Sequence, residues 1–235
     1  MPWGTEMLPR RWRTTLSLLA LVGLLGGCTT TTTLVSGALA PEEADRQARG
    51  ACGERYDGEV GVQLAMIGQQ LDDDRPRAAL AYLDTFGFDY PQAKLLRAEA
   101  LRRIDRRALA DRVYLELRDT CLAADAYRGL ALNAAHRGAL DEALVLMQSA
   151  RDRRPADARI RNDLGYLLLL GQDHREARQQ FLTALELDEG QRNAASNLVL
   201  SLMQEGRQGE AERMARRYGV DDTLLAQLRR LETNN

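Results

Sequence analysis

Small and apolar residues recur at positions i, i+4 and i+7 in several segments of the chain. The clearest instance is Ala143, Met147 and Ala150. This spacing places the three side chains on one narrow face of an α-helix. Related stripes occur at Ala110, Tyr114 and Leu117, and at Ala177, Phe181 and Ala184. The pattern therefore predicts a helical protein in which such stripes pack against partner helices.

The stripes belong to a longer period of 34 residues. At this offset Leu130 falls over Leu164, and the small residue Ala131 falls over Gly165. Pro155 is expected to end the second helix of this unit, because proline has no amide hydrogen with which to continue it. A 34-residue period with a large–small pair early and alanines late resembles the tetratricopeptide repeat, whose unit is two antiparallel helices. The resemblance implies an all-α fold, an α-solenoid of stacked helical hairpins, rather than a helical bundle with accidental spacing.

The period also divides the chain into segments. Before the aligned repeats the pattern continues in weaker form, and after them a last leucine stripe is expected to cap the solenoid. The predicted segments are a signal peptide (1–27), a tether (28–44), degenerate helical hairpins (45–123), three repeats (124–157, 158–191 and 192–225) and a capping helix with its tail (221–235).

Two helix boundaries carry recognisable turn chemistry. Asp74 is expected to cap a helix that has Pro76 in its first turn, where the missing amide is harmless. Gly219 is expected to stop the second helix of the third repeat. Asp72, Asp73 and Asp74 precede a helix start and have no further ligand near them in the sequence. We therefore interpret them as a helix boundary rather than a metal site.

The amino-terminal segment has a pattern of another kind. Arg10, Arg11 and Arg13 precede an apolar run of about ten residues, half of what a membrane-spanning helix needs. This predicts an export signal rather than a retained transmembrane anchor. The run ends in Leu25-Gly26-Gly27-Cys28, which resembles the lipobox of bacterial lipoproteins. The resemblance implies cleavage before Cys28, diacylglycerol on its sulfur and a fatty acid such as palmitate on the new amino terminus. The alternative is an ordinary secretory signal with a chance cysteine.

The residues after the cysteine indicate where the domain is held. By the sorting pattern of enterobacterial lipoproteins, Thr29 in the second mature position implies a lipid-anchored protein on the periplasmic face of the outer membrane. The following threonines lack apolar periodicity, which predicts a flexible tether. Removal of the signal leaves 29 basic and 33 acidic residues. This balance gives no reason to expect a nucleic-acid partner.

Two cysteines remain besides Cys28. In an exported protein Cys52 and Cys121 are expected to form a disulfide that closes a loop of 69 residues. The alternative is two separately buried thiols.

Catalytic arrangements are missing from the sequence. It contains no GxSxG nucleophile elbow, no phosphate-binding glycine loop and no CxxC pair. His136 and His174 occupy non-equivalent positions of different repeats, so they do not predict a metal site. We therefore expect a protein without enzymatic activity, without a metal and without a cofactor other than the covalent lipid on Cys28.

The tetratricopeptide resemblance also implies a groove that binds peptides. Solenoids of this family present their first helices to an extended peptide or a partner helix. Leu169 and Met203 fall at groove positions but are expected to lie in the core. The family's remaining groove positions correspond to Arg128, His136, Arg159, Asn162, Tyr166, Asn193, Ser196 and Asn197.

The segment from Arg161 to Arg217, which includes "NDLGY" and "ALELD", resembles the TadD-type lipoproteins of tight-adherence (Flp-type) pilus systems. The resemblance implies a scaffold that holds proteins of a pilus or secretion complex during assembly, above all the outer-membrane secretin. The alternatives are another lipidated adaptor of this fold, such as a type IV pilus pilotin, or an adaptor for periplasmic proteases or cell-wall enzymes.

Overall fold

The computed structural model describes residues 47–221, 223 and 225–227. The predicted signal peptide, Cys28 and the tether lie outside these residues, as does most of the predicted capping segment. The chain divides into two units, 1–40 and 41–235, and the description below concerns the second. Residues 223 and 225–227 are helical.

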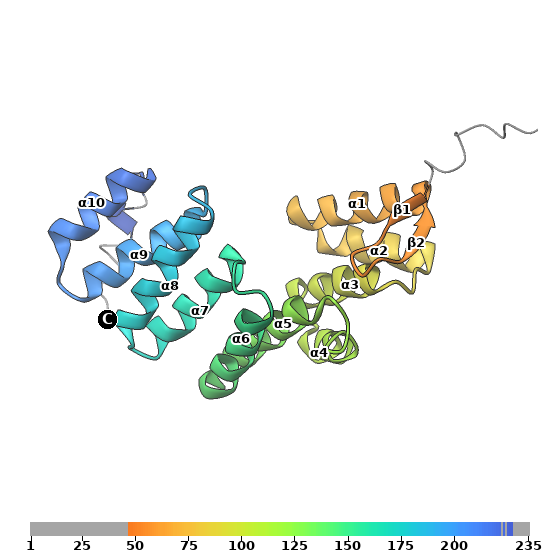
Figure 1. Cartoon of the computed structure of the whole chain (residues 1–235), viewed down its shortest axis with the longest axis horizontal. Coiled ribbons are helices and arrows are strands. Elements are labelled where there is room, and N and C mark those ends of the chain that lie inside the picture. The colour runs from red at the N-terminus through yellow and green to blue at the C-terminus, as the bar shows by residue number, and fades with distance from the viewer. Residues whose placement is uncertain (1–46, 222, 224, 228–235) are drawn as a thin grey trace, which may run out of the picture. The chain divides into compact units, whose positions relative to one another are not determined.

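Before these residues, the described part consists of a short β-hairpin and five helix pairs (Figure 1). The strands are β1 (Gln47–Arg49) and β2 (Arg55–Asp57). The first helices of the pairs are α1 (Gly58–Asp72), α3 (Pro91–Arg103), α5 (Ala123–His136), α7 (Ala158–Leu170) and α9 (Arg192–Gln204). The second helices are α2 (Pro76–Phe86), α4 (Arg107–Glu116), α6 (Leu140–Arg153), α8 (His174–Leu187) and α10 (Gln208–Tyr218).

Each helix packs mainly on the helices before and after it in the chain. This nearest-neighbour packing is the organisation of a repeat solenoid. The expectation of an all-α solenoid is therefore confirmed.

The predicted stripes of the second helices form the core of the pairs. Ala143, Met147 and Ala150 are fully buried on α6. Phe181 takes the place of Met147 on α8 and is equally buried. The helix ends also agree with the sequence. α6 ends at Arg153, shortly before Pro155, and α10 ends at Tyr218, with Gly219 as its C-cap in the positive-φ conformation.

The turn inside each pair is the same in all five pairs. One residue in each turn has a positive φ, and the second helix begins two residues after it. The amide that follows this residue donates to a carbonyl five residues earlier in the chain, which is the closure of a Schellman motif. The five positive-φ residues are Asp74, Asp105, Gly138, Gln172 and Gly206. The two pairs before residue 123 therefore use the same turn as the three aligned repeats.

This turn overturns the expectation that Asp74 caps α2. Asp74 has a φ of 55°, and Arg75 takes the capping position without a side-chain hydrogen bond. Aspartate is one of the few residues that tolerate the left-handed conformation. The acidic side chain is thus used for the turn and not for the helix start.

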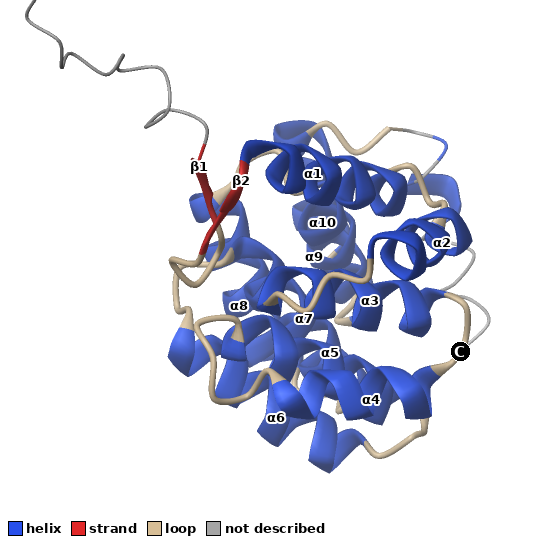
Figure 2. Ribbon diagram, turned by 90° about the vertical axis from the view of Figure 1, so that its right-hand side faces the viewer, coloured by secondary structure: helices blue, strands red, loops and turns tan. Residues whose placement is uncertain are grey.

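The β-hairpin also departs from the prediction, which placed helical hairpins from residue 45 onward. β1 and β2 pair in antiparallel fashion, with Ala48 opposite Tyr56, and β2 runs directly into α1 (Figure 2). Gly53, with a φ of 84°, permits the connecting turn. Tyr56 is buried and its hydroxyl donates to the Gln92 side chain of α3 at 3.3 Å. This packing attaches the hairpin to α3.

Two glycines within helices have opposite surroundings. A Cβ atom at Gly129 of α5 would lie 2.2 Å from the ring of Tyr114 on α4, whereas one at Gly68 of α1 would lie 3.9 Å from its nearest neighbour, Leu96. Gly129 therefore permits the close approach of two consecutive pairs, and Gly68 has no such role.

Alanine substitutions at these two positions are expected to change the stability of the fold in opposite directions. Gly129→Ala is expected to destabilise the fold by about 1–3 kcal/mol, because the new methyl group overpacks a filled core. Gly68→Ala is expected to stabilise it by about 0.5–1 kcal/mol, the usual gain of alanine over glycine in a helix. Urea unfolding of both variants measures the two free energies. Stabilisation by Gly129→Ala would contradict the close contact with Tyr114.

Candidate protein-binding site

The predicted groove residues lie on the first helices α5, α7 and α9. On each helix three positions, one turn apart, recur at an offset of 34 residues. We call this surface the inner face and define it by the residues at these positions: Arg128, Leu132 and His136 on α5, Asn162, Tyr166 and Leu170 on α7, and Ser196, Leu200 and Gln204 on α9. Leu169 and Met203 are buried in the core, as expected.

The predicted residues differ in how much of each side chain is available to a partner. Tyr166 is 43% exposed, and the Arg159 side chain is 56% exposed. His136 and Asn193 are also exposed, whereas Ser196 and Asn197 are half-buried. Asn162 is buried.

Arg128 is already occupied by partners from two neighbouring helices. Its Nε donates to Asp163 Oδ2 of α7 at 2.6 Å, and its Nη1 lies 3.8 Å from Glu99 Oε1 of α3. Burial by itself would lower the pKa of the guanidinium, but the charges of Asp163 and Glu99 outweigh it and raise the pKa. The side chain is only 18% exposed. Arg128 therefore joins three hairpins and does not offer a free cation to a peptide carboxylate.

The two central asparagines are likewise engaged with each other. Asn197 Nδ2 of α9 donates to Asn162 Oδ1 of α7 at 3.0 Å, and Asn162 Nδ2 donates to Asp163 Oδ1 at 3.1 Å. A continuous polar chain thus runs across α3, α5, α7 and α9. The repeat period predicted the positions of these residues, but Asp163 was missed, although it lies 34 residues after Gly129 and 34 before Asn197.

A second polar cluster lies at the amino-terminal ends of α5 and α7. Arg154 Nη2 contacts Asp125 Oδ2 at 2.7 Å, and Arg154 Nη1 contacts Asp157 Oδ2 at 3.2 Å. Asp157 also caps α7, since its Oδ1 accepts from the amides of Arg159 and Ile160. Burial opposes the ionisation of Asp157, yet the hydrogen bonds from Arg159, the Ile160 amide and Arg154 prevail and lower its pKa.

Asp157→Ala is expected to cost about 1–2 kcal/mol of folding free energy at pH 7, because α7 loses its cap. The lowered pKa means that the ionised carboxylate stabilises the folded state above the ordinary pKa of 3.8 and loses this effect as the pH falls through the lowered value. The difference between variant and wild type should therefore shrink below about pH 4. Urea unfolding at pH 7 and at pH 3 measures this difference in stability. Asp119→Ala, at an exposed position, is the control. An equal loss at both pH values would contradict the role of the charge.

An apolar row lies beside the polar chain on the inner face. Leu132, Tyr166 and Leu200 occupy the same position of three successive first helices, 34 residues apart. Leu132 and Leu200 are half-buried, and Leu170, one turn after Tyr166, is 50% exposed. The sequence predicted only Tyr166 of this row. The period applied to Tyr166 would have found the two leucines.

A pocket of about 260 Å³ lies at the start of α9 and the end of α10. Of the predicted residues it contains Ser196, whose hydroxyl donates to the Arg192 carbonyl. Its lining residues are Arg192, Ala195, Ser196, Tyr218, Gly219, Val220 and Asp221.

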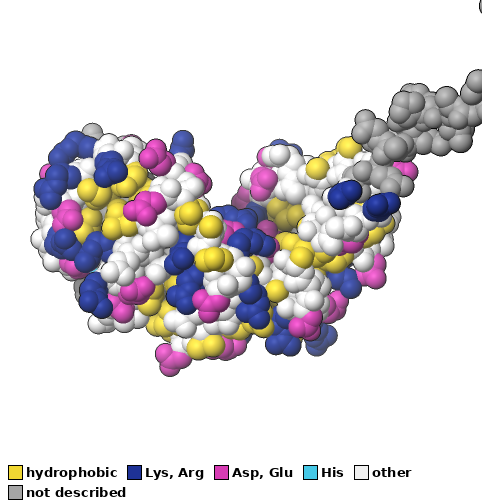
Figure 3. Space-filling view, viewed as in Figure 1, with side chains coloured by type: hydrophobic (Ala, Val, Ile, Leu, Met, Phe, Trp, Pro, Cys, Tyr) yellow, Lys and Arg dark blue, Asp and Glu magenta, His cyan; other side chains and the backbone are white. Residues whose placement is uncertain are grey.

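Charge is mixed over the face of the molecule seen in Figure 3, where basic and acidic side chains alternate with small apolar patches. Within the described residues, no group of three or more histidines, cysteines or acids is placed to hold a metal ion. The described helices include none with the length and apolarity of a membrane span.

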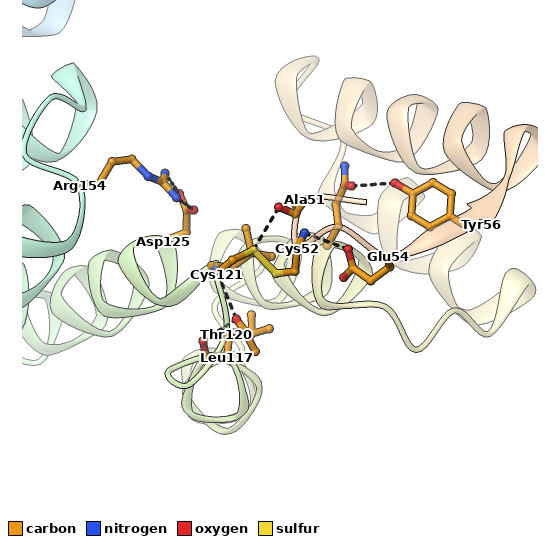
Figure 4. The surroundings of a disulfide bond; sticks show 11 residues. Ala51, Cys52, Glu54, Tyr56, Leu117, Thr120, Cys121, Asp125 and Arg154 are labelled. Atoms are coloured by element: carbon orange, nitrogen blue, oxygen red, sulfur yellow. Dashed lines mark hydrogen bonds and ion pairs between the residues drawn. A yellow bond between two sulfur atoms is a disulfide. The ribbon is translucent and has the colours of Figure 1, made fainter. Parts of the chain in front are cut away.

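A disulfide joins Cys52, in the turn of the β-hairpin, to Cys121, in the connection between α4 and α5 (Figure 4). The Cα atoms are 5.4 Å apart, and 69 residues separate the two cysteines. The Cys52 amide donates to Glu54 Oε2 at 2.9 Å. The bond therefore attaches the start of the described chain to the segment just before α5.

Comparison with known proteins gives the following results. No protein-family model matches the chain. The TPR repeat-containing protein PA4299 of Pseudomonas aeruginosa is 35% identical over 199 residues, which are 84% of this chain and 76% of that protein.

Solved structures share the fold. YrrB, described as a TPR protein with an unusual peptide-binding site, is 18% identical, with a TM-score of 0.50 over 72% of this chain and 90% of that one. PilF of Pseudomonas aeruginosa is 20% identical, with a TM-score of 0.54 over 71% of this chain and 75% of that one.

Proposed function

This chain belongs to the tetratricopeptide-repeat (TPR) proteins, and on that basis we propose that it is a scaffold that binds another protein on its inner face. The observation that carries the proposal is the apolar row of Leu132, Tyr166 and Leu200, which the solenoid leaves partly open on successive first helices. Partly exposed aromatic residues are frequent anchors of protein interfaces. The peptide-binding site named for YrrB supports a binding role for this fold. We assign the protein no catalytic step and no cofactor.

The scaffold is anchored to the outer membrane, on its periplasmic face, through lipid on Cys28. The lipobox-like sequence before Cys28 supports this part of the proposal. More than one acyl chain is required for stable anchoring. Metabolic labelling with an alkyne analogue of palmitate, in cells producing wild type or Cys28→Ala, tests it. Labelling of the wild type alone is expected, and an unlabelled, uncleaved wild type would refute the anchor.

The bound protein is a component of a tight-adherence (Flp-type) pilus machine, and the scaffold assists assembly of its secretin. The resemblance of residues 161–217 to TadD-type lipoproteins supports this choice of partner.

Affinity purification from detergent-solubilised envelopes tests the choice, with wild type compared with Tyr166→Glu. A secretin is expected to co-purify with the wild type and to be lost with Tyr166→Glu, because a charge at this position cannot dock against an apolar surface. Val145→Glu, at an exposed position of α6, is the matched control and should retain the secretin. Recovery of hydrolases alone would favour the adaptor for proteases or cell-wall enzymes.

A further inference from the structure

Aromatic side chains gather near the amino-terminal end of the described chain. Five rings follow one another from α2 to the β-hairpin, and the centroids of consecutive rings lie 5.1–6.1 Å apart. We call this group the aromatic cluster. It consists of Tyr82, Phe86, Phe88, Tyr90 and Tyr56. The whole protein has seven tyrosines and three phenylalanines, so half of them lie in this cluster.

The repeat does not require aromatic residues at this place. Phe88 lies in the connection between α2 and α3, beside the hairpin (Figure 1). At the same distance from the positive-φ turn residue, the next three pairs have the exposed acids Asp119, Asp152 and Glu186. These pairs close without an apolar side chain at this position. The aromatic residue is therefore particular to the first pair.

The cluster is open to solvent along part of its length. Tyr82 is 39% exposed, and Phe86, Phe88 and Tyr90 are half-buried. The inner sides of the last three pack on the core of the first pair. The open surface thus combines aromatic rings with the phenol group of Tyr82. Proteins use such amphipathic rings at the membrane–water interface, where one end is apolar and the other is wet.

The charges around the cluster are balanced. Asp84 Oδ1 lies 2.5 Å from Arg97 Nη1, and Asp89 Oδ1 lies 2.9 Å from Lys94 Nζ. The hairpin, residues 47–57, has two arginines, one glutamate and one aspartate. No excess of either sign is present to select a strongly charged ligand. A surface of zwitterionic phospholipid headgroups, which also has no net charge, matches this balance.

The predicted tether joins the folded domain at this same place. β1 begins at Gln47, and the next residue, Ala48, lies opposite Tyr56 of the cluster. About 20 residues separate Cys28 from β1, and a flexible chain of that length has an r.m.s. span of roughly 25 Å. A tether this short keeps the membrane surface at an effective concentration of roughly millimolar. Even a weak contact between the cluster and the bilayer would therefore be occupied.

We propose that the aromatic cluster seats the scaffold on the bilayer, with Tyr82, Phe86 and Phe88 in the headgroup layer of zwitterionic phospholipid. The inference rests on the lipid anchor proposed above and adds a second, non-covalent contact with the same membrane. This contact orients the solenoid, because the first helix pair then lies at the membrane surface.

Tryptophan fluorescence tests the seat. Trp3 and Trp12 are the two tryptophans of the sequence, and both are removed with the predicted signal peptide. Phe88→Trp therefore gives the processed protein a single reporter. The processed lipoprotein, with its lipid verified by mass spectrometry, is reconstituted into phosphatidylcholine vesicles. Its emission is compared between ordinary vesicles and vesicles with bromine on the acyl chains, which quenches tryptophan only at short range.

The emission of Phe88→Trp is expected to fall by about half in the brominated vesicles, because the ring lies at the interface. About 0.5 M salt should not restore the emission, since the contact does not depend on charge. Tyr82→Trp, at the most exposed ring of the cluster, should give the same result without disturbing the core. Val145→Trp, on α6 and 63% exposed, is the matched control and should not be quenched.

Unquenched emission from both Phe88→Trp and Tyr82→Trp, in protein that has its lipid, would overturn the seat and leave the anchor intact. A blue shift without quenching would show that protein, such as a second copy of the chain, covers the cluster, and would also overturn the seat. Equal quenching of Val145→Trp would overturn it as well, because the contact would not be specific to the cluster. Absence of lipid from the purified protein would instead refute the anchor, and the seat with it.

Discussion

Phe181→Ala is expected to lower the free energy of unfolding by about 3–5 kcal/mol, the usual cost of removing a buried phenylalanine ring. Phe181 is fully buried on α8. A Cβ atom at Gly165 of α7 would lie 2.6 Å from its ring, so no side chain of α7 at this position is present to fill the space that the ring vacates. The variant therefore leaves a cavity inside the α7–α8 pair, at the centre of the proposed binding region.

Urea unfolding, monitored by circular dichroism, measures the loss of unfolding free energy. Leu187→Ala is the matched control on the same helix, because Leu187 is 43% exposed and its truncation should cost less than about 1 kcal/mol. Hydrogen exchange should rise in α7 to α10 before it rises in α1 to α4, since a solenoid transmits stability only between neighbours. Equal losses for Phe181→Ala and Leu187→Ala would contradict the packing described above.

Removal of the disulfide is expected to cost about 4 kcal/mol, the loop entropy of a 69-residue closure. The expected effect of the double variant Cys52→Ser, Cys121→Ser is largest at the β-hairpin, which is otherwise held by the packing of Tyr56 and its bond to Gln92. Thermal and urea unfolding of the double variant measure the total loss of stability. Hydrogen exchange at residues 47–57 measures the loss within the hairpin.

Reduction provides an independent control for this prediction. Dithiothreitol should lower the stability of the wild type toward that of the double variant and leave the double variant unchanged. Alkylation of unreduced protein, followed by mass spectrometry, should label neither Cys52 nor Cys121. Two labelled cysteines in the unreduced protein would show that the bridge is absent in solution.

The repeat and its stripes could be predicted from the sequence because both depend on local periodicity. Ala143, Met147 and Ala150 had to share one helix face, and all are buried. The turn at Asp74 could not be predicted in the same way. Its side chain was equally suited to a helix cap, and the left-handed conformation was selected by the closure between α1 and α2.

The β-hairpin was missed for a similar reason. Its strands have three residues each, too few for an alternating pattern to stand out from a loop. Their pairing depends on Tyr56, which packs near α3 and bonds to Gln92, a residue 36 positions later in the chain. Contacts of this range leave no periodic trace in the sequence.

By itself the sequence determined the 34-residue period, the buried stripes and the helix pairs. An α-helix has about 3.6 residues per turn, so the side chains on its buried face recur every three or four positions. Only the tertiary structure decided which inner-face side chains are free. Arg128 could have served a peptide carboxylate, but stacking of α5 on its neighbours places Asp163 and Glu99 around it. Tyr166 lies one turn after Asp163 on α7; within the described residues it has no such partner, and it remains 43% exposed. The difference arises because a charged group that is partly removed from water must be paired, and the pairing residue comes from another hairpin.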